Sequence, residues 1–358
     1  KLITLGGKTA LFEKWGLSAR GPRLWALKNR IDRAFAARLD DLKPMAPPAL
    51  PRDVTQGVRA EISGGQPICT GCAGKVGPGT LAGALAALPQ DRSIGVETGV
   101  GDDAAILNVG GTRQVITTDH LRAFTEDPAV FARIAALHAL GDVSAMGAAP
   151  QAALAQVNLP RMSDTLQSRT LAEILAAATE VFADAGAAIV GGHTTLGGEL
   201  TLGFTLTGIA AGSPITLGGG RPGDTLILTR PIGSGTLLAG DMALKARGPH
   251  LSAMMAELAR PQGPAARILK TAHAMTDVTG FGLAGHLMNI AEASALASEI
   301  DLDMVPVFDG ALELADAGVR PTLYPANRMR AAGANIPDSP RTALLFDPQT
   351  AGGLLAAV

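Results

Sequence analysis

Apolar and polar positions along the chain repeat with two periods, one typical of helices and one typical of strands. In the segment 171–185, apolar residues recur every three or four positions, which predicts an amphipathic helix, and Gly186 stands where a helix C-cap is expected. From Leu202 to Leu206, apolar residues alternate with Thr and Gly, which predicts a half-buried strand. Because helical and extended segments alternate along most of the chain, we expect a mixed α and β fold.

Further segments place residues that matter for function. A strand is predicted at 114–118 with Asp119 at its end, and a helix is predicted to begin at Asp127-Pro128 and to run towards Leu140. A short helix between prolines is expected at 78–88. A buried strand is expected at 187–190, ending in the turn Gly191-Gly192-His193-Thr194. A new strand at 225–229 follows the glycine-rich segment 218–224, which indicates a domain boundary.

The first 42 residues differ from those that follow. Leu24, Leu27, Ile31 and Phe35 share one face of a predicted helix, and basic residues surround them. Such a helix either packs on a neighbouring domain or lies on a membrane surface, and both alternatives stay open. Several prolines then predict an extended connector, namely Pro44, Pro47, Pro48 and Pro51. We therefore expect a segment with its linker at 1–52, a domain at 53–215 and a domain at 216–358.

The composition is that of a globular enzyme. The chain has 358 residues, of which 47% are apolar and 17% charged, and its formal net charge is −2. This balance gives no reason to expect nucleic acid as a partner. The only cysteines, Cys69 and Cys72, exclude a four-cysteine zinc site and argue against a disulfide-stapled secreted protein. Because there is neither an apolar run of about 18 residues nor a secretion signal, we expect a cytoplasmic protein.

Five acidic residues stand in apolar or glycine-rich surroundings: Asp102, Asp103, Asp119, Asp142 and Asp277. One such residue alone is more often a turn or cap residue. Five together are costly to bury unless cations compensate them, and Mg²⁺ takes oxygen ligands that it shares with substrate phosphates. The set therefore predicts a metal–phosphate site.

Two glycine segments agree with a phosphate site, since backbone without side chains lets amide groups approach phosphate oxygens. They are Gly191-Gly192-His193-Thr194 and Ile232-Gly233-Ser234-Gly235-Thr236, and each follows a predicted strand. Alone, each is weak evidence. The chain has neither a Gly-x-x-x-x-Gly-Lys-Ser/Thr loop nor a Gly-x-Gly-x-x-Gly segment before a helix. A Walker-type or kinase-type nucleotide site is therefore not expected.

Cys72 precedes Lys75 by three residues in a glycine-rich stretch. The pair Cys69 and Cys72 has the spacing of a redox dithiol or of half a zinc site. A nearby ammonium stabilises a thiolate, which favours Cys72 as a nucleophile or as a residue that handles a chalcogen. Lys75 is suited to bind phosphate as a point charge. An exposed loop with an incidental thiol is the alternative, and the residues alone do not decide between these.

From about Gln66 onward, the chain resembles selenophosphate synthetase (selenide, water dikinase). Parts of the pattern recur in the wider superfamily of aminoimidazole ribonucleotide synthetase and thiamine-phosphate kinase. The Cys72 loop and the segment from Asp347 to Thr350 narrow the resemblance to selenophosphate synthetase within this superfamily. The matching motifs follow the family's order: Cys72-Ala73-Gly74-Lys75, Asp102-Asp103-Ala104-Ala105, Thr117-Thr118-Asp119, Arg133-Ile134-Ala135-Ala136 with Asp142, Ala145-Met146-Gly147, Gly191-Gly192-His193, Thr276-Asp277-Val278-Thr279-Gly280-Phe281-Gly282, Gly285-His286-Leu287, Asn327, and Asp347-Pro348-Gln349-Thr350-Ala351-Gly352-Gly353-Leu354.

The resemblance implies an α+β fold of two domains, an N-terminal sheet domain and a C-terminal α/β sandwich domain, with ATP between the domains of a homodimer. It implies conversion of ATP, selenide and water to selenophosphate, AMP and phosphate, with Mg²⁺ and, as a second cation, a monovalent one such as K⁺. Cys72 and Lys75 match the catalytic pair, and Asp103, Asp142 and Asp277 match the metal ligands. The nucleotide contacts match Lys75, Gly101, Asp102, Asp119, Asp142, Gly192, His193 and Thr194, of which the last three reach across the dimer.

Some features depart from this family. His138 stands where a polar amide is expected, and Cys69 is an additional thiol that leaves a disulfide with Cys72 open. The chain begins with Lys1 and stops soon after Gly353, so we expect part of a longer protein whose second domain lacks its closing elements and exposes an apolar face. Residues 1–42 resemble the tail of a flavin-dependent NADH dehydrogenase or sulfide:quinone reductase-like protein, which implies a fused upstream flavoprotein domain. The resemblance rests on Trp15, Gly21-Pro22, the stretch from Trp25 to Arg30, and Ile31-Asp32-Arg33.

Two alternatives to the selenide-dependent enzyme are kept. One is a related ATP-dependent kinase or ligase that acts on another small molecule. The other is a truncated module that binds nucleotide without activity.

Overall fold

The computed structural model describes residues 1–40, 53, 68–86, 95–332 and 336–358. The chain divides into two compact units, an N-terminal unit at 1–65 and a large unit at 66–358. The proline connector and most of the predicted boundary at 52/53 lie outside the described residues. Within the described residues, no helix is long and apolar enough to cross a membrane.

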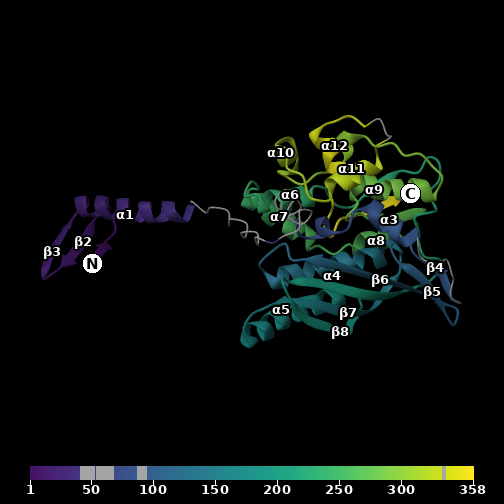
Figure 1. The fold of residues 1–358 in the computed structure, drawn as a ribbon, viewed down its shortest axis with the longest axis horizontal. Coiled ribbons are helices and arrows are strands. Elements are labelled where there is room, and N and C mark those ends of the chain that lie inside the picture. Colours follow the sequence, from purple (N-terminus) through teal and green to yellow (C-terminus); the bar gives the residue numbers. More distant parts are fainter. Residues whose placement is uncertain (41–52, 54–67, 87–94, 333–335) are drawn as a thin grey trace. The chain divides into compact units, whose positions relative to one another are not determined.

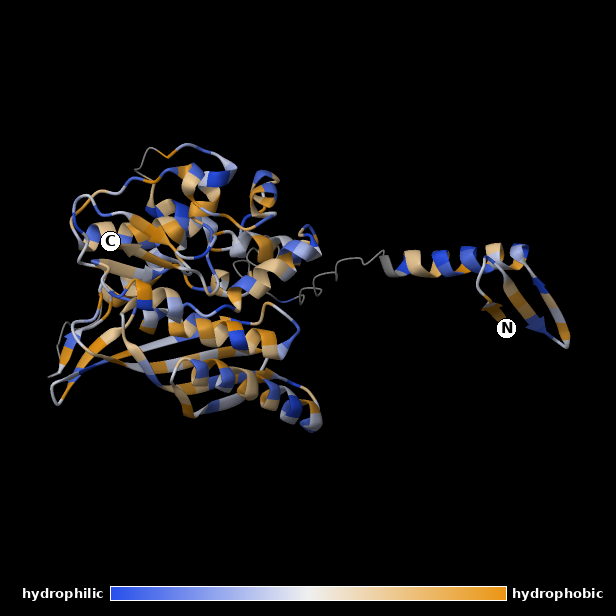
Figure 2. Ribbon diagram, turned by 180° about the vertical axis from the view of Figure 1, so that it is seen from behind, coloured by the Kyte–Doolittle hydropathy of each residue, from blue (hydrophilic) through white to orange (hydrophobic). Residues whose placement is uncertain are grey.

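The N-terminal unit combines a small sheet with one helix. Strands β1 (Leu2–Thr4), β2 (Ala10–Lys14) and β3 (Leu17–Gly21) form an antiparallel meander, and helix α1 (Pro22–Asp40) follows directly. The helix was predicted, whereas the meander was not, because its strands are too short to show a period. Apolar and polar residues alternate along α1 (Figure 2), and Leu27, Ile31 and Phe35 on its apolar face are exposed.

The large unit begins with a six-stranded sheet in the order β4-β5-β6-β9-β7-β8. Only the pair β7 and β8 is parallel, and the other neighbours are antiparallel. Helices α4 (Pro128–Ala145) and α5 (Asp164–Asp184) accompany this sheet (Figure 1). The strands are β4 (Val96–Thr98), β5 (Ala105–Val109), β6 (Thr112–Arg122), β7 (Ala149–Pro160), β8 (Ala188–Gly197) and β9 (Thr201–Ala210).

Helix α4 is the central element of the core. Its N-cap Asp127 accepts hydrogen bonds from the amides of Ala129 and Val130, as the sequence predicted. Every residue from Phe131 to Ala145 except Arg133 is buried, so the helix is enclosed on nearly all sides. Its apolar sequence therefore carries the polar residues of its later turns, His138 and Asp142, into the interior.

A second, smaller sheet has the order β10-β12-β11, with both neighbouring pairs antiparallel. Its strands are β10 (Leu226–Leu228), β11 (Ala274–Asp277) and β12 (Leu354–Ala357). Its helices are α6 (Ser234–Met242), α7 (Gly248–Leu258), α8 (Gly263–Ile268), α9 (Gly282–Ala293), α10 (Ala311–Asp316), α11 (Tyr324–Arg330) and α12 (Pro340–Leu345). A largely apolar cavity of about 850 Å³ adjoins the sheet and is lined by Leu226, Leu287 and Leu355 among others.

The structure corrects two predicted strand ends. Asp119 does not end its strand, because β6 continues to Arg122 and pairs with β9 from Arg113 to Arg122. The segment from Gly191 to Thr194 is not a turn but lies inside the edge strand β8. A Cβ atom at Gly192 would collide with the carbonyl oxygen of Ala155 on β7, so close pairing of the strands explains this glycine.

Candidate active site

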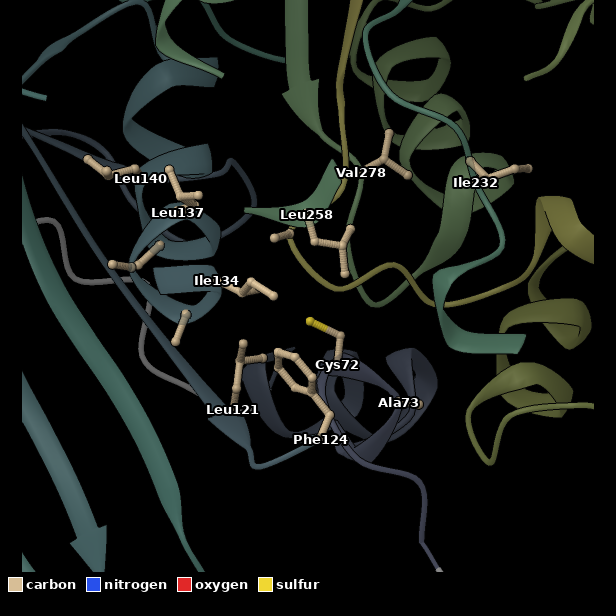
Figure 3. Close-up of a cluster of buried hydrophobic side chains, with 14 of the residues drawn as sticks. Cys72, Ala73, Leu121, Phe124, Ile134, Leu137, Leu140, Ile232, Leu258 and Val278 are labelled. Atoms are coloured by element: carbon tan, nitrogen blue, oxygen red, sulfur yellow. The ribbon is translucent and has the colours of Figure 1, made fainter. Parts of the chain in front are cut away.

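Cys72 lies in a short 3-10 turn, Cys72–Gly74, rather than in an exposed loop. Its side chain is 0% exposed and lies in an apolar cluster with Leu121, Phe124 and Ile134 (Figure 3). The interpretation as an exposed, incidental thiol is therefore wrong. Both cysteines are free thiols, so the disulfide left open by the sequence does not form in this structure.

A polar group on helix α4 reaches the buried sulfur. His138 Nε2 on α4 lies 3.2 Å from Cys72 Sγ, within hydrogen-bonding distance. The same nitrogen lies 3.4 Å from Asp119 Oδ2. The sequence marked His138 as a departure from the family pattern, and its contact with Cys72 was not predicted. The four-residue spacing between His138 and Asp142 was the available signal, because it places both side chains on one face of the helix.

Lys75 and Asp119 form an ion pair, with Lys75 Nζ 2.9 Å from Asp119 Oδ1. Burial lowers the pKa of Lys75, but Asp119 and Cys72 raise it more, so the ammonium form is strongly favoured. Burial likewise raises the pKa of Asp119, and His138 and Lys75 together bring it below its usual value. Asp119 is therefore an ionised carboxylate that links the lysine to the histidine.

Three other carboxylates meet beside this pair. Oxygens of Asp103, Asp142 and Asp277 lie within 4.8 Å of one another, although the residues come from the turn before β5, from α4 and from the end of β11. Oδ2 of Asp103 is buried, and it has no hydrogen-bond partner among the residues that the structure describes. The three residues predicted as metal ligands are thus brought together.

The electrostatics of this cluster call for a cation. Burial and the neighbouring carboxylates raise the pKa values of Asp103 and Asp142 well above the usual range. Burial and Asp103 raise the pKa of Asp277 to about 8. A divalent cation among the three would reverse this effect, because oxygen ligands of this kind are those that hard cations prefer. The unpartnered oxygen and the crowded charges therefore fit a metal site.

Two hydroxyl groups orient the carboxylates. Thr117, on the same face of β6 as Asp119, donates to Oδ2 of Asp142, and Thr276 donates to Oδ1 of Asp103 at 2.7 Å. Both threonines belong to motifs quoted above, but the sequence assigned them no role. For Thr117, the available signal was the period of two along a strand, which places its side chain on the same side as that of Asp119.

Gly141 lets the cluster form. It stands beside Asp142 on α4, and a Cβ atom here would collide with Oδ2 of Asp277. The absence of a side chain allows strand β11 to bring Asp277 against the helix. This close approach was not predicted from the sequence.

The segment from Asp347 to Ala351 holds the cysteine turn. The amide of Cys72 donates to Thr350 Oγ1 at 3.2 Å, and the amide of Ala351 donates to Nδ1 of His138 at 3.3 Å. A motif near the end of the chain thus fixes both partners of the contact between sulfur and imidazole.

The phosphate prediction for the segment from Ile232 to Thr236 is not supported. Gly233 has φ of 112° and caps helix α6, but the amides of Gly233 and Ser234 donate to Oε1 of Gln349. The amide of Gly235 donates to Asp347 Oδ2 at 3.0 Å. An internal carboxylate therefore occupies the place at this helix end where a phosphate was expected.

The remaining predicted nucleotide residues lie at two places. Gly101 is exposed with φ of 126°, and the neighbouring Asp102 accepts hydrogen bonds from the amides of Asp103 and Leu217. Gly192, His193 and Thr194 are exposed on the edge strand β8. Since β8 is three strands from β6, these residues lie about 14 Å from Asp119 across the sheet and are not brought to the site of their own chain.

Two domain models match the chain in sequence order. The N-terminal domain of AIR synthase related proteins matches residues 101–210, and the C-terminal domain matches residues 221–323. A selenide, water dikinase from Nitratidesulfovibrio vulgaris is 39% identical over 303 residues, covering 80% of this chain and 85% of the relative. One from Geobacter metallireducens is 37% identical over 303 residues, with the same shares covered.

Solved structures with a similar fold include thiamine monophosphate kinases. That from Aquifex aeolicus has a TM-score of 0.56 at 18% identity, covering 78% of this chain and 87% of that chain. That from Stenotrophomonas maltophilia has a TM-score of 0.55 at 21% identity, covering 75% and 81%. At such identities the likeness concerns the fold alone. Together with the domain matches, it confirms the predicted two-domain α+β fold.

Proposed function

The chain belongs to the selenide, water dikinase family, and from this premise we propose that Cys72, Lys75 and the carboxylate cluster form its catalytic centre. The enzyme is a kinase that uses ATP to convert selenide to selenophosphate, with AMP and phosphate as the other products. The observation that carries the assignment is the continuous group from Cys72 through His138 and Asp119 to Lys75, next to three crowded carboxylates.

Phosphoryl transfer depends on positioning and on charge neutralisation more than on covalent help. Asp103, Asp142 and Asp277 would hold a divalent cation, proposed to be Mg²⁺, which would supply charge neutralisation to the phosphates of ATP. A monovalent cation such as K⁺ is a further proposal. Lys75, held by Asp119, presents an ammonium to the same region. The turn that contains Cys72 holds selenide and excludes water, since it is buried in apolar surroundings.

The nucleotide contacts proposed for one chain are Lys75, Gly101, Asp102, Asp119 and Asp142. Gly192, His193 and Thr194 are proposed to contact the nucleotide of a second copy, which makes the enzyme a homodimer. Their exposure on an edge strand supports this, because an edge is available to a partner.

The proposed domain boundary at 215/216 is supported by the interval between the two domain matches, from 210 to 221. Residues 1–52 are proposed to be the end of a fused upstream flavoprotein domain. The exposed apolar face of α1 supports packing against further protein, and contact with a membrane through residues 1–42 remains the alternative proposal. The site of action is proposed to be the cytoplasm.

The assignment is tested by anaerobic release of AMP from ATP with magnesium, with and without selenide. Cys72→Ala and Lys75→Ala are expected to lose the selenide-dependent part while still binding ATP. Cys69→Ala is the matched control and is expected to keep the selenide-dependent release of AMP. Retained selenide-dependent turnover in Cys72→Ala and Lys75→Ala would overturn the assignment of the catalytic pair.

A further inference from the structure

His138 is the one polar side chain seen within hydrogen-bonding distance of the Cys72 sulfur in the described structure. It lies in the interior of α4 with its side chain 0% exposed, and its ring spans three groups. Nε2 faces Cys72 Sγ at 3.2 Å and Asp119 Oδ2 at 3.4 Å, while Nδ1 faces the amide of Ala351 at 3.3 Å. Each nitrogen therefore has a defined environment.

These contacts assign the proton on the ring. The amide of Ala351 is a donor, so Nδ1 must offer a lone pair and carries no proton. With an amide donor at Nδ1, the ring is a neutral imidazole that carries a single proton. That proton is on Nε2, because Nδ1 is already occupied by a donor.

An N–H group on Nε2 faces the sulfur as a donor. From this we propose that His138 is a positioning residue, whose Nε2–H donates to Cys72 Sγ, fixes the direction of the sulfur and favours its thiolate form. Its role is opposite to that of a histidine that removes a proton from the thiol, since such a base needs a free lone pair on Nε2. The inference deepens the function proposed above and rests on it.

The position of the donor links the two halves of the large unit. His138 comes from the helix of the six-stranded sheet, whereas the amide that fixes its ring belongs to Ala351, just before β12. Thr350, one residue earlier, accepts from the amide of Cys72. The contact between His138 and the Cys72 sulfur therefore depends on the segment of Thr350 and Ala351, which hydrogen-bonds to both residues.

The test compares His138→Leu, which removes the donor, with His138→Gln, which keeps a side-chain N–H. The matched control is His120→Leu. His120 is exposed, lies on the face of β6 opposite to that of Asp119, and is hydrogen-bonded through Nε2 to Thr201. All are made in the Cys69→Ala background, so that Cys72 is the remaining thiol. The first readout is the ultraviolet thiolate absorbance at about pH 7, taken as the difference from the same protein with Cys72→Ala.

We expect His138→Leu to lose this thiolate signal, and His138→Gln and His120→Leu to keep most of it. Selenide-dependent kcat/KM should fall about tenfold to hundredfold in His138→Leu, the range for a lost hydrogen bond to a charged group, with ATP affinity unchanged. His138→Gln should recover most of that loss.

An unchanged thiolate signal in a folded His138→Leu, or equal losses in the Leu and Gln variants, would overturn the role of His138. If His138→Leu does not fold, His138→Gln is compared with His138→Asn, whose shorter side chain cannot reach the sulfur. Equal thiolate signals in these two variants would overturn the role of His138. The thiolate signal is measured without turnover. Absence of selenide-dependent turnover in the unsubstituted chain would therefore count against the proposed function and not against this inference.

Discussion

Lys75 and Asp119 form the ion pair that connects the cysteine turn to strand β6, with 2.9 Å between Nζ and Oδ1. The second oxygen of Asp119 faces His138, so one carboxylate orients both a lysine and a histidine. Since Asp119 is paired with Phe204 of β9, its position is fixed by the sheet. The pair therefore places the Lys75 ammonium beside the carboxylate cluster.

Asp119→Asn tests this role. The amide keeps the shape of the side chain but removes its charge, so Lys75 loses its ionic partner. We expect a fall in selenide-dependent kcat of about tenfold to hundredfold, as for loss of a charged hydrogen bond. Steady-state kinetics at saturating ATP measure it. A kcat equal to that of the unsubstituted enzyme would contradict the orienting role.

The carboxylate cluster predicts an unusual pH dependence of stability without metal. The folded-state pKa of Asp277 is raised to about 8, so its protonated form favours folding at low pH. That contribution is complete below the ordinary Asp pKa near 4 and is lost as the pH rises towards about 8, by at most about 1.4 kcal/mol per pH unit for one group. The melting temperature in a chelator should fall over this range.

If magnesium occupies the proposed site, it should remove this fall, because it would bind the ionised carboxylates. Asp277→Asn should flatten the profile in chelator, while Asp309→Asn, at an exposed position, should leave it unchanged. Thermal denaturation with and without magnesium gives the answer. Identical pH profiles in both conditions would argue against a metal site at these residues.

Gly141→Ala tests the close approach of β11 to α4. The new Cβ atom would meet the carboxylate of Asp277 and displace it from the cluster. We expect the magnesium concentration for half-maximal turnover to rise about tenfold or more. The helix itself should tolerate alanine, which is about 1 kcal/mol better than glycine in a helix.

Gly83→Ala is the matched control, because this glycine lies in α3 (Pro78–Ala86) and no atom of the described residues outside its own helix lies within 4 Å of its missing Cβ. It should leave the magnesium dependence unchanged. Equal magnesium dependence in the Gly141 and Gly83 variants would show that Gly141 has no part in the site.

Much of the fold follows from the sequence because its signals are local. The cap at Asp127, the glycine after α5 and the alternation in β9 each predict an element that the structure contains. Strand ends were less predictable. Asp119 and the segment from Gly191 to Thr194 were placed beyond their strands, because pairing with a neighbour, and not the residues themselves, extends β6 and β8.

The site was predicted in its residue types but not in its contacts. The proposed metal ligands follow from acidic residues in apolar sequence, which is a local signal. The contact between His138 and Cys72 joins residues 66 positions apart, and Asp347 reaches an amide 112 positions away. No periodicity in the sequence reveals such pairs. The N-terminal end of helix α6 was therefore predicted to bind phosphate, although Asp347 already accepts a hydrogen bond there.

Thr350→Val tests the anchoring of the cysteine turn. Valine has a similar shape but cannot accept the hydrogen bond from the amide of Cys72. Leaving that buried amide without a partner costs about 1–3 kcal/mol, so its hydrogen exchange should accelerate about tenfold or more. Exchange of the peptide around Cys72 reports this by mass spectrometry. Thr170→Val, on helix α5, is the control, and equal exchange in both variants would contradict the anchoring.

Subunit mixing tests whether β8 completes the site of a second copy. Cys72→Ala and His193→Ala are each expected to be nearly inactive as homodimers. In a mixed dimer, one site would combine the intact Cys72 of one chain with the intact His193 of the other, so equal mixing should restore about a quarter of full activity. No recovery in dimers shown to exchange subunits would contradict a shared site.

Phosphorus NMR of the products formed from ATP and magnesium under anaerobic conditions, with and without selenide, shows whether this chain makes selenophosphate. We expect a selenophosphate signal together with AMP and phosphate, all dependent on selenide and absent with Cys72→Ala. ATP binding without any selenide-dependent product would contradict it.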